Sequence, residues 1–400
     1  MKTTWIPSFL SAPLSLFTRD IPPPLGPIPP RLPCSGDLCH SVQALPPRFF
    51  SSLNPERYKV GYGPLTISAH NNNSSYGQQR TQGKNYFYFN SAPPCTDCFI
   101  TNIQADLEYI TNGGISSTVG TNVDTGGGRG GRGGGYYLHH LVVGNLERDS
   151  VTCPLNFEPI LVSGSERRSE AQLSVNGSLR AGYYIGETGL LVFSAEVDTD
   201  LMIPGENHGR DDDDALLLLL TVDWEWVPAS SAEGFGKLTP VWFDIDGVCS
   251  LRGGEVPVSM ERPEVGLKMD PVWRADFAGD LVWIGGHLDD GGETLEVTRN
   301  GTVVCEMRAG YEGAEGSLEV GSGRGNDGSY GPGVVEPAKE HLSSMSSCAL
   351  LGRMEVGDEW GLTANYNLTK HKPTEERSAS GQLALVMGVA LMYVVRDGQS

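Results

Sequence analysis

The sequence predicts an all-β protein built from two antiparallel β-sandwich domains of jelly-roll-like form, preceded by a disordered, proline-rich segment. Three observations predict this fold. Short apolar runs alternate with clusters of Gly, Asn and Asp, and no stretch keeps a helical period over about three turns. The 400 residues exceed what one core usually serves, roughly 250–300 residues. The 52 glycines and 26 prolines fit a loop-rich β architecture.

The elements follow in order along the chain. Residues 1–49 contain the run "IPPPLGPIPP" and are expected to be extended and poorly packed. The first domain, 50–230, holds the expected strands "YFYFN", "CFITNIQADLEYI", "YYLHHLVVGN", "EPILVSG", "AGYYIGETGLLVFSAEV" and "ALLLLLTVDWEWVP". After a linker rich in small residues, the second domain, 235–397, holds "VWFDIDGVC", "FAGDLVWIGGHLDDGG", "TLEVTRNGTVVCEM", "EWGLTANYNLTKH" and the C-terminal apolar run. The two domains are expected to share an interface.

Charge and hydropathy exclude two classes of partner. The net charge of −20 gives a surface that repels phosphate backbones, so no nucleic acid is expected. No apolar run reaches the roughly 18 residues of a membrane helix, so no membrane span is expected. A small molecule, or a cell-surface or extracellular partner of unknown identity, remains.

Cysteines and glycosylation motifs favour a secreted protein. The cysteine count of eight is even, and five Asn-X-Ser/Thr motifs are present, beginning at Asn72, Asn73, Asn176, Asn300 and Asn367. The N-terminus reads as a poor signal peptide, because prolines interrupt its apolar stretch.

Disulfides are expected to use most of these cysteines. Cys95 and Cys98 form a C-x-x-C in a loop without thioredoxin-like or zinc-site context, which favours a structural disulfide. The four cysteines of the later chain permit three pairings, and Cys305–Cys348 is the preferred one.

Two adjacent histidines, His139 and His140, stand inside the apolar strand "YYLHHLVVGN". In a regular strand their rings would point to opposite faces, one into the core. A bulge would instead turn both rings toward one point. The family resemblance described below implies the bulged geometry, near the surface between the domains and with His287 of "GGHLDDGG" across a cleft.

Copper is the cofactor that these residue types suggest. Neutral imidazole suits copper, and a methionine thioether suits Cu(I). Met387 and Met392 lie in the last strand at an odd spacing, so they face opposite sides. The alternative is that the histidines are hydrogen-bonded structural groups and that the methionines belong to the core.

Five motifs in order carry a family resemblance: "YYLHHLVVGN", "WIGGHLDDGG", "RNGTVVCEM", "HLSSMSSC" and "VMGVALMYVV". The chain resembles the stress up-regulated nodulin-type family, and its arrangement is similar to that of the two-copper peptidylglycine α-hydroxylating monooxygenases. The resemblance implies two β-sandwich domains that each hold one copper, facing one another across an open cleft. His139 and His140 match the first copper pair, and His287 and Met387 match parts of the second.

The chain departs from that pattern at two ligand positions. Asp289 stands where the second histidine of a His-x-His pair is expected. Where the third histidine of the first site is expected, the chain has Glu196, Val197 and Asp198 but no histidine. The candidate metal residues are therefore His139, His140, His287, Asp289 and Met387. With both sites incomplete, the sequence favours a secreted, stress-related, non-catalytic protein; the alternative is a copper-dependent monooxygenase or oxidoreductase.

Overall fold

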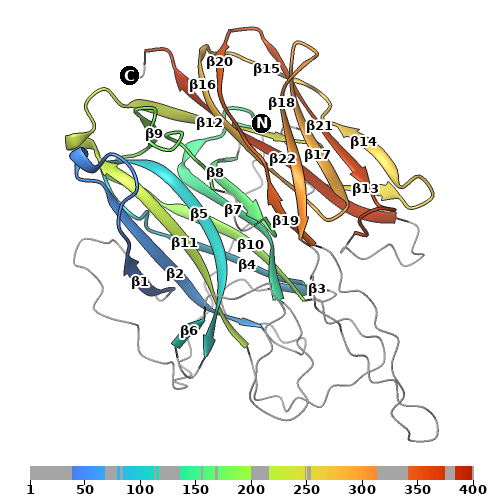
Figure 1. The fold of residues 1–400 in the computed structure, drawn as a ribbon, viewed down its shortest axis with the longest axis horizontal. Helices are drawn as coiled ribbons and strands as arrows, with labels where there is room; N and C mark the ends of the chain where they lie inside the picture. Colours follow the sequence, from blue (N-terminus) through green and yellow to red (C-terminus); the bar gives the residue numbers. More distant parts are fainter. Residues whose placement is uncertain are drawn as a thin grey trace, which may run out of the picture.

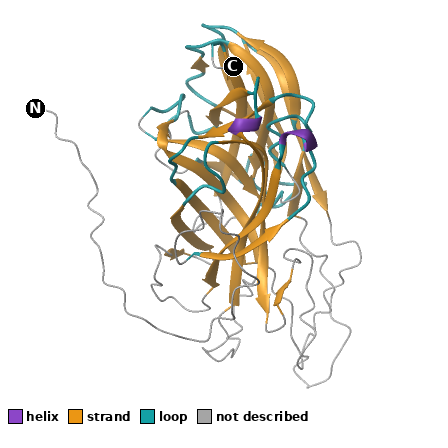
Figure 2. Ribbon diagram, turned by 90° about the vertical axis from the view of Figure 1, so that its left-hand side faces the viewer, coloured by secondary structure: helices purple, strands orange, loops and turns teal. Residues whose placement is uncertain are grey.

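The computed structural model consists almost entirely of β-strands, which confirms the predicted all-β sandwich class (Figure 1). It describes residues 38–67, 79–81, 84–111, 114–116, 136–154, 156–166, 170–199, 216–247, 249, 254–312, 341–373 and 383–398. The described helices are two single turns, η1 (Ser51–Leu53) and η2 (Ala229–Ser231), drawn in Figure 2. Most of the proline-rich segment expected at the N-terminus lies outside the described residues. No helix in the described chain is long and apolar enough to cross a membrane.

One long sheet of eleven strands runs through both halves of the chain. Its first part contains β1 (Cys39–Ala44), β2 (Glu56–Ile67), β11 (Leu216–Pro228), β5 (Cys98–Thr111), β9 (Ala181–Ile185) and β6 (Gly114–Ser116). Its second part contains β12 (Gly236–Asp244), β22 (Leu383–Arg396), β16 (Gly279–Leu288), β20 (Cys348–Met354) and β13 (Glu255–Ser259). A short parallel pairing of β9 with β12 joins the parts, and the other described strand pairs are antiparallel.

A smaller sheet faces each part of the long sheet. The five-stranded sheet contains β3 (Gln79–Thr81), β4 (Lys84–Ser91), β10 (Leu191–Thr199), β7 (Tyr136–Asp149) and β8 (Phe157–Gly164). The six-stranded sheet contains β14 (Glu264–Lys268), β21 (Glu359–Asn367), β17 (Gly292–Arg299), β18 (Thr302–Glu312), β19 (His341–Met345) and β15 (Trp273–Arg274). We call the layers formed by β1–β11 the N-terminal sandwich and those formed by β12–β22 the C-terminal sandwich. Whether they fold as separate domains with the boundaries given above stays a prediction.

Strand β22 shows how the two sandwiches pack. Ala390, Met392 and Val394 point into the core of the C-terminal sandwich. Leu391 and Tyr393 point the other way, into the core of the N-terminal sandwich. Because both faces of β22 are covered, its sequence is a continuous apolar run without polar alternation. The interface therefore has the character of a core, and it fixes the position of one sandwich against the other.

Disulfides stabilise the loops and the interface. The expected Cys305–Cys348 bond is confirmed, with an S–S distance of 2.06 Å, and Cys95–Cys98 is also bonded. A third bond, Cys153–Cys249, joins the loop after β7 to the loop after β12 and thus links the two sandwiches covalently.

We predict that Tyr393→Phe weakens this interface. The buried Tyr393 hydroxyl donates to the carbonyl of Ile160 in β8 at 2.7 Å, so its loss leaves a buried acceptor unsatisfied. The expected loss is about 1–3 kcal/mol in the free energy of unfolding, measured in urea. Tyr88→Phe is the control, since Tyr88 is 53% exposed and should stay within about 0.5 kcal/mol. Equal stability of Tyr393→Phe and the parent would contradict the role of this bond.

Candidate metal centre

The two adjacent histidines lie at a β-bulge in β7. Glu196 of β10 pairs with His140, but the next residue of β10 pairs with Leu138, so His139 is one residue extra. Leu138 and Leu141 consequently both point into the hydrophobic core, and the two histidines between them turn to the opposite face. Their ring centroids lie 4.0 Å apart with an angle of 23° between the planes. The expected bulged geometry is confirmed, and regular alternation does not occur.

Asp289 reaches the same point from the C-terminal sandwich. His287 is near the end of β16, Leu288 points into the C-terminal core, and Asp289 follows directly after the strand. The period of two places His287 and Asp289 on the face that is turned toward β7 and β8. The His140 ring donates from Nε2 to Asp289 Oδ1 at 2.8 Å. The contact therefore joins the two sandwiches through side chains that are 149 residues apart.

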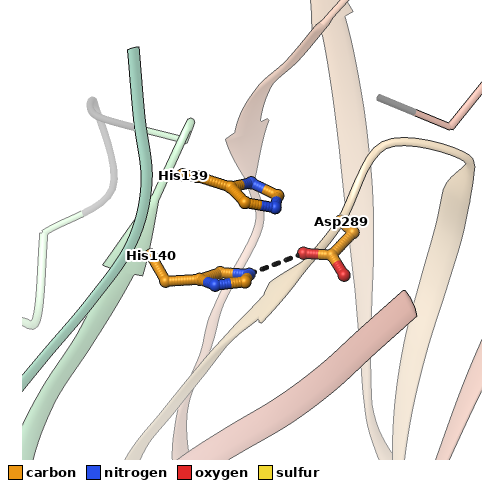
Figure 3. A group of neighbouring side chains, drawn as sticks. All are labelled: His139, His140 and Asp289. Atoms are coloured by element: carbon orange, nitrogen blue, oxygen red, sulfur yellow. Dashed lines mark hydrogen bonds and ion pairs between the residues drawn. The ribbon is translucent and has the colours of Figure 1, made fainter. Parts of the chain in front are cut away.

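These residues form one compact group of metal-ligand type (Figure 3). One ligand atom each from His139, His140 and Asp289 lies within 4.8 Å of the others. The residues are 2%, 9% and 2% exposed, so the expectation of a group near the surface is wrong. The sandwiches pack directly against each other here, and this packing buries the group.

His287 adjoins the group. The sequence analysis had instead expected His287 to face the group across a cleft. Its ring centroid lies 5.0 Å from that of His140. Nδ1 donates to Glu166 Oε1 at 2.7 Å. Nε2 lies 3.3 Å from Asp289 Oδ1 but forms no hydrogen bond there. His140 and His287 thus both contact the same carboxylate oxygen, Asp289 Oδ1.

Met387 supports Asp289 through its backbone. Its amide donates to Asp289 Oδ2, and its carbonyl accepts a hydrogen bond from the Tyr366 hydroxyl. The same hydroxyl accepts a hydrogen bond from the Asp289 amide at 3.2 Å. The side chain of Met387 lines a neighbouring pocket, whereas Met392 is buried in the C-terminal core. Of the two methionines in the last strand, Met387 is therefore the one on the side of the centre.

The charges of the centre are mutually stabilising. Burial alone would lower the pKa of His140, but Asp289 and Glu196 outweigh it and raise that pKa to about 10. Burial likewise opposes the protonation of His287, but Glu166 and Asp289 raise its pKa to about 9. Burial would raise the pKa of Asp289, yet the neighbouring histidines hold it well below its ordinary value. Without a metal, the centre is therefore a buried network of imidazolium and carboxylate groups.

Two glutamates orient the histidine rings. Glu196 lies opposite His140 in the sheet, and its Oε2 accepts a hydrogen bond from His140 Nδ1 at 3.1 Å. The sequence analysis named Glu196 only because it lies where a further histidine was expected, and it did not predict the contact with His140. Glu166 was missed, because the sequence around it carries no motif and its role depends on β8 packing against β16.

A pocket of about 470 Å³ opens beside the centre. His140, Glu196, His287 and Met387 form one part of its wall. The outer face of the five-stranded sheet, the disulfide-linked loops, residues of β12 and the start of β13 form the rest. Asp244, which also lines it, is buried, and burial raises its pKa to about 7. A candidate metal group and a ligand-sized pocket thus adjoin each other.

The donor set fits a transition metal. Imidazole nitrogens bind copper, zinc, iron and nickel, and one carboxylate adds a harder oxygen ligand. The hydrogen bonds of His140 to Glu196 and of His287 to Glu166 are the arrangement that fixes the rings of metal-binding histidines. His139, His140 and Asp289 could hold one metal ion, and Nε2 of His287 is a further atom that could bind it.

Comparison with known proteins points to oxygenases. The chain is 28% identical to "Probable copper-dependent oxygenase M1" of Phoma sp. over 365 residues, which cover 91% of this chain and 78% of that protein. It is 29% identical to "Probable copper-dependent oxygenase clz3" of Cochliobolus lunatus over 266 residues, 66% of this chain and 73% of that protein. These matches support a relation to copper-oxygenase-like proteins. No protein-family model matches the chain, and membership of the nodulin-type family stays a prediction.

Similarity to solved structures is remote. PNGF-II matches 83% of this chain and 65% of its own length, at a TM-score of 0.37 and 10% identity, so the chain spans less than two thirds of it. PNGase F, a glycosylasparaginase from Flavobacterium meningosepticum, matches 84% of this chain and 96% of its own length, at a TM-score of 0.37 and 8% identity. Similarity at this level carries no inference about function.

We predict that Gly164→Ala on β8 pushes against His287 and the backbone of His139 and so destabilises the protein. Gly164 pairs with His140, and an added Cβ would lie 2.4 Å from His287 Cε1 and 2.3 Å from the His139 carbonyl oxygen. Overpacking of this kind costs about 1–3 kcal/mol in the free energy of unfolding, measured in urea. Gly186→Ala is the control, since the nearest atom to its added Cβ is 3.9 Å away. If both variants are as stable as the parent, the close packing of β8 on His287 is refuted.

Proposed function

We propose that this protein is a copper-dependent oxygenase with one copper held between its two sandwiches. The observation that carries the proposal is the convergence of His139, His140 and Asp289 on one buried point beside a pocket. The names of the two oxygenase relatives give the metal and the class of reaction. The sequence alone favoured a non-catalytic scaffold, since the expected ligand pattern was incomplete. The converging side chains and these relatives favour the alternative.

In this proposal His139, His140 and Asp289 are the ligands, and His287 is the further donor nearest to them. Bound copper would supply the redox chemistry that activates oxygen, using electrons from an external reductant. Glu196 holds the ring of His140 in one orientation. The backbone amide of Met387 holds Asp289 in the same manner. The packed interface excludes water from the ligands, and the pocket presents a substrate to one side of them.

A second metal deserves a direct comparison, because two histidines and one carboxylate are also the ligand set of non-haem iron(II) oxygenases. Two considerations favour copper. An N/O site of given geometry binds copper(II) more tightly than iron(II), and both oxygenase relatives carry copper in their names. Iron as the resident metal would keep the oxygenase class and change the cofactor.

We further propose that the protein is secreted. Three disulfides join described cysteines, and such bonds persist in oxidising compartments. Asn176, the acceptor of one glycosylation motif, is exposed in a turn of left-handed backbone conformation. A glycan on Asn176, detected by mass spectrometry of protein from the native source, would support passage through the secretory route.

We predict that the parent protein binds one copper per chain in equilibrium dialysis and that His139→Ala/His140→Ala binds none at the same free copper concentration. Two of the three proposed ligands are then missing. Asp289→Asn should retain the shape of the site but weaken binding by about 10–100-fold, since it replaces an anionic ligand with a neutral one. Total metal analysis of the purified protein, covering copper, iron and zinc, identifies the resident ion.

The control is His40→Gln, which removes another buried histidine, on β1 of the N-terminal sandwich. It should bind copper like the parent. Circular dichroism melting of each variant separates ligand loss from unfolding. Unchanged copper binding in a folded His139→Ala/His140→Ala variant would contradict the proposed centre.

A further inference from the structure

The wall of the pocket beside the candidate metal centre combines apolar surface with acidic groups. Its apolar part includes Val142, Val162 and Val192, which share the outer face of the five-stranded sheet. Tyr88 on β4 and Trp242 on β12 add aromatic surface. Side chains of these types bury hydrocarbon and aromatic groups favourably.

The wall carries carboxyl groups together with two histidines that are already paired with carboxylates: His140 contacts Glu196 and Asp289, and His287 contacts Glu166. Among the described residues that line the pocket, Glu196, Asp244 and Glu255 carry carboxyl groups, and neither lysine nor arginine is present. A carboxylate or phosphate entering the pocket would lose hydration and meet these carboxyl groups, and it could pair with an imidazolium only by displacing a carboxylate that the histidine already contacts. The net charge of −20 for the whole chain adds repulsion at longer range.

We propose that this pocket binds a mainly apolar organic molecule that carries no anionic group, and that this molecule is the substrate of the oxygenase proposed above. Only the identification of this molecule as a substrate rests on the proposed oxygenase function. The binding preference follows from the residues of the wall. A volume of about 470 Å³ suits a molecule of ordinary small-ligand size. Because His140 and His287 belong to the same wall, a bound molecule would lie against the metal centre.

The test uses two probes of the same carbon skeleton, 4-phenyl-1-butanol and 4-phenylbutanoate, titrated calorimetrically into metal-free protein. The alcohol should bind, and the carboxylate should bind at least about tenfold more weakly. Val162→Trp, which fills the pocket, should abolish binding of the alcohol. Val303→Trp is the matched control, because Val303 is 46% exposed on β18 and does not line the pocket. Melting temperatures of both variants show whether they fold.

The charge of the wall is tested by Glu255→Gln, which should narrow the difference in affinity between the two probes. Equal or tighter binding of the carboxylate by the parent protein would overturn the proposal, as would absence of alcohol binding. Alcohol binding that survives in folded Val162→Trp would place the ligand elsewhere and overturn it too. Since no copper is present, these outcomes are independent of the copper experiment. Loss of the copper result with the probe preference intact would refute the oxygenase function alone.

Discussion

The extra residue that β7 carries opposite β10 is the constraint on which the centre depends. A regular strand would bury one of two adjacent histidines in the core and leave the other alone on the far face. The bulge lets Leu138 and Leu141 fill the core together and directs His139 and His140 to the same side. The packing of the two leucines in the apolar core therefore holds His139 and His140 side by side, although the histidines themselves add nothing to that core. Bulges are enriched beside active sites, among other places, because they redirect side chains in this way.

The second constraint is the interface between the sandwiches. Strand β22 has core on both of its faces, and the Tyr393 hydroxyl bonds to the backbone of β8. The Cys153–Cys249 disulfide links the loops at the pocket. This packing carries Asp289 and His287 to the bulge and removes water from their charges. The buried carboxylates and imidazoles are stable there because each neutralises another, so removing one partner should cost more than the pair contributes.

Much of the fold could be predicted from local pattern. Apolar runs separated by Gly, Asn and Asp gave the strands, and the adjacent histidines suggested the bulge. The Cys305–Cys348 bond was also predicted. The relation between the sandwiches could not be read from the sequence, since it depends on pairings of residues far apart in the chain. For that reason His287 was expected across a cleft from His139 and His140, Asp289 was taken as a substitute in a separate site, and Glu166 was not noticed at all.

The central claim is that both sandwiches contribute ligands to one metal centre. Diffraction data collected at the copper absorption edge from crystals of copper-loaded protein test this most directly. The account predicts a single anomalous peak per chain, bounded by His139, His140 and Asp289. Two separate peaks, one at His139 and His140 and another at His287 and Met387, would contradict it and restore the two-site arrangement that the sequence resemblance implies.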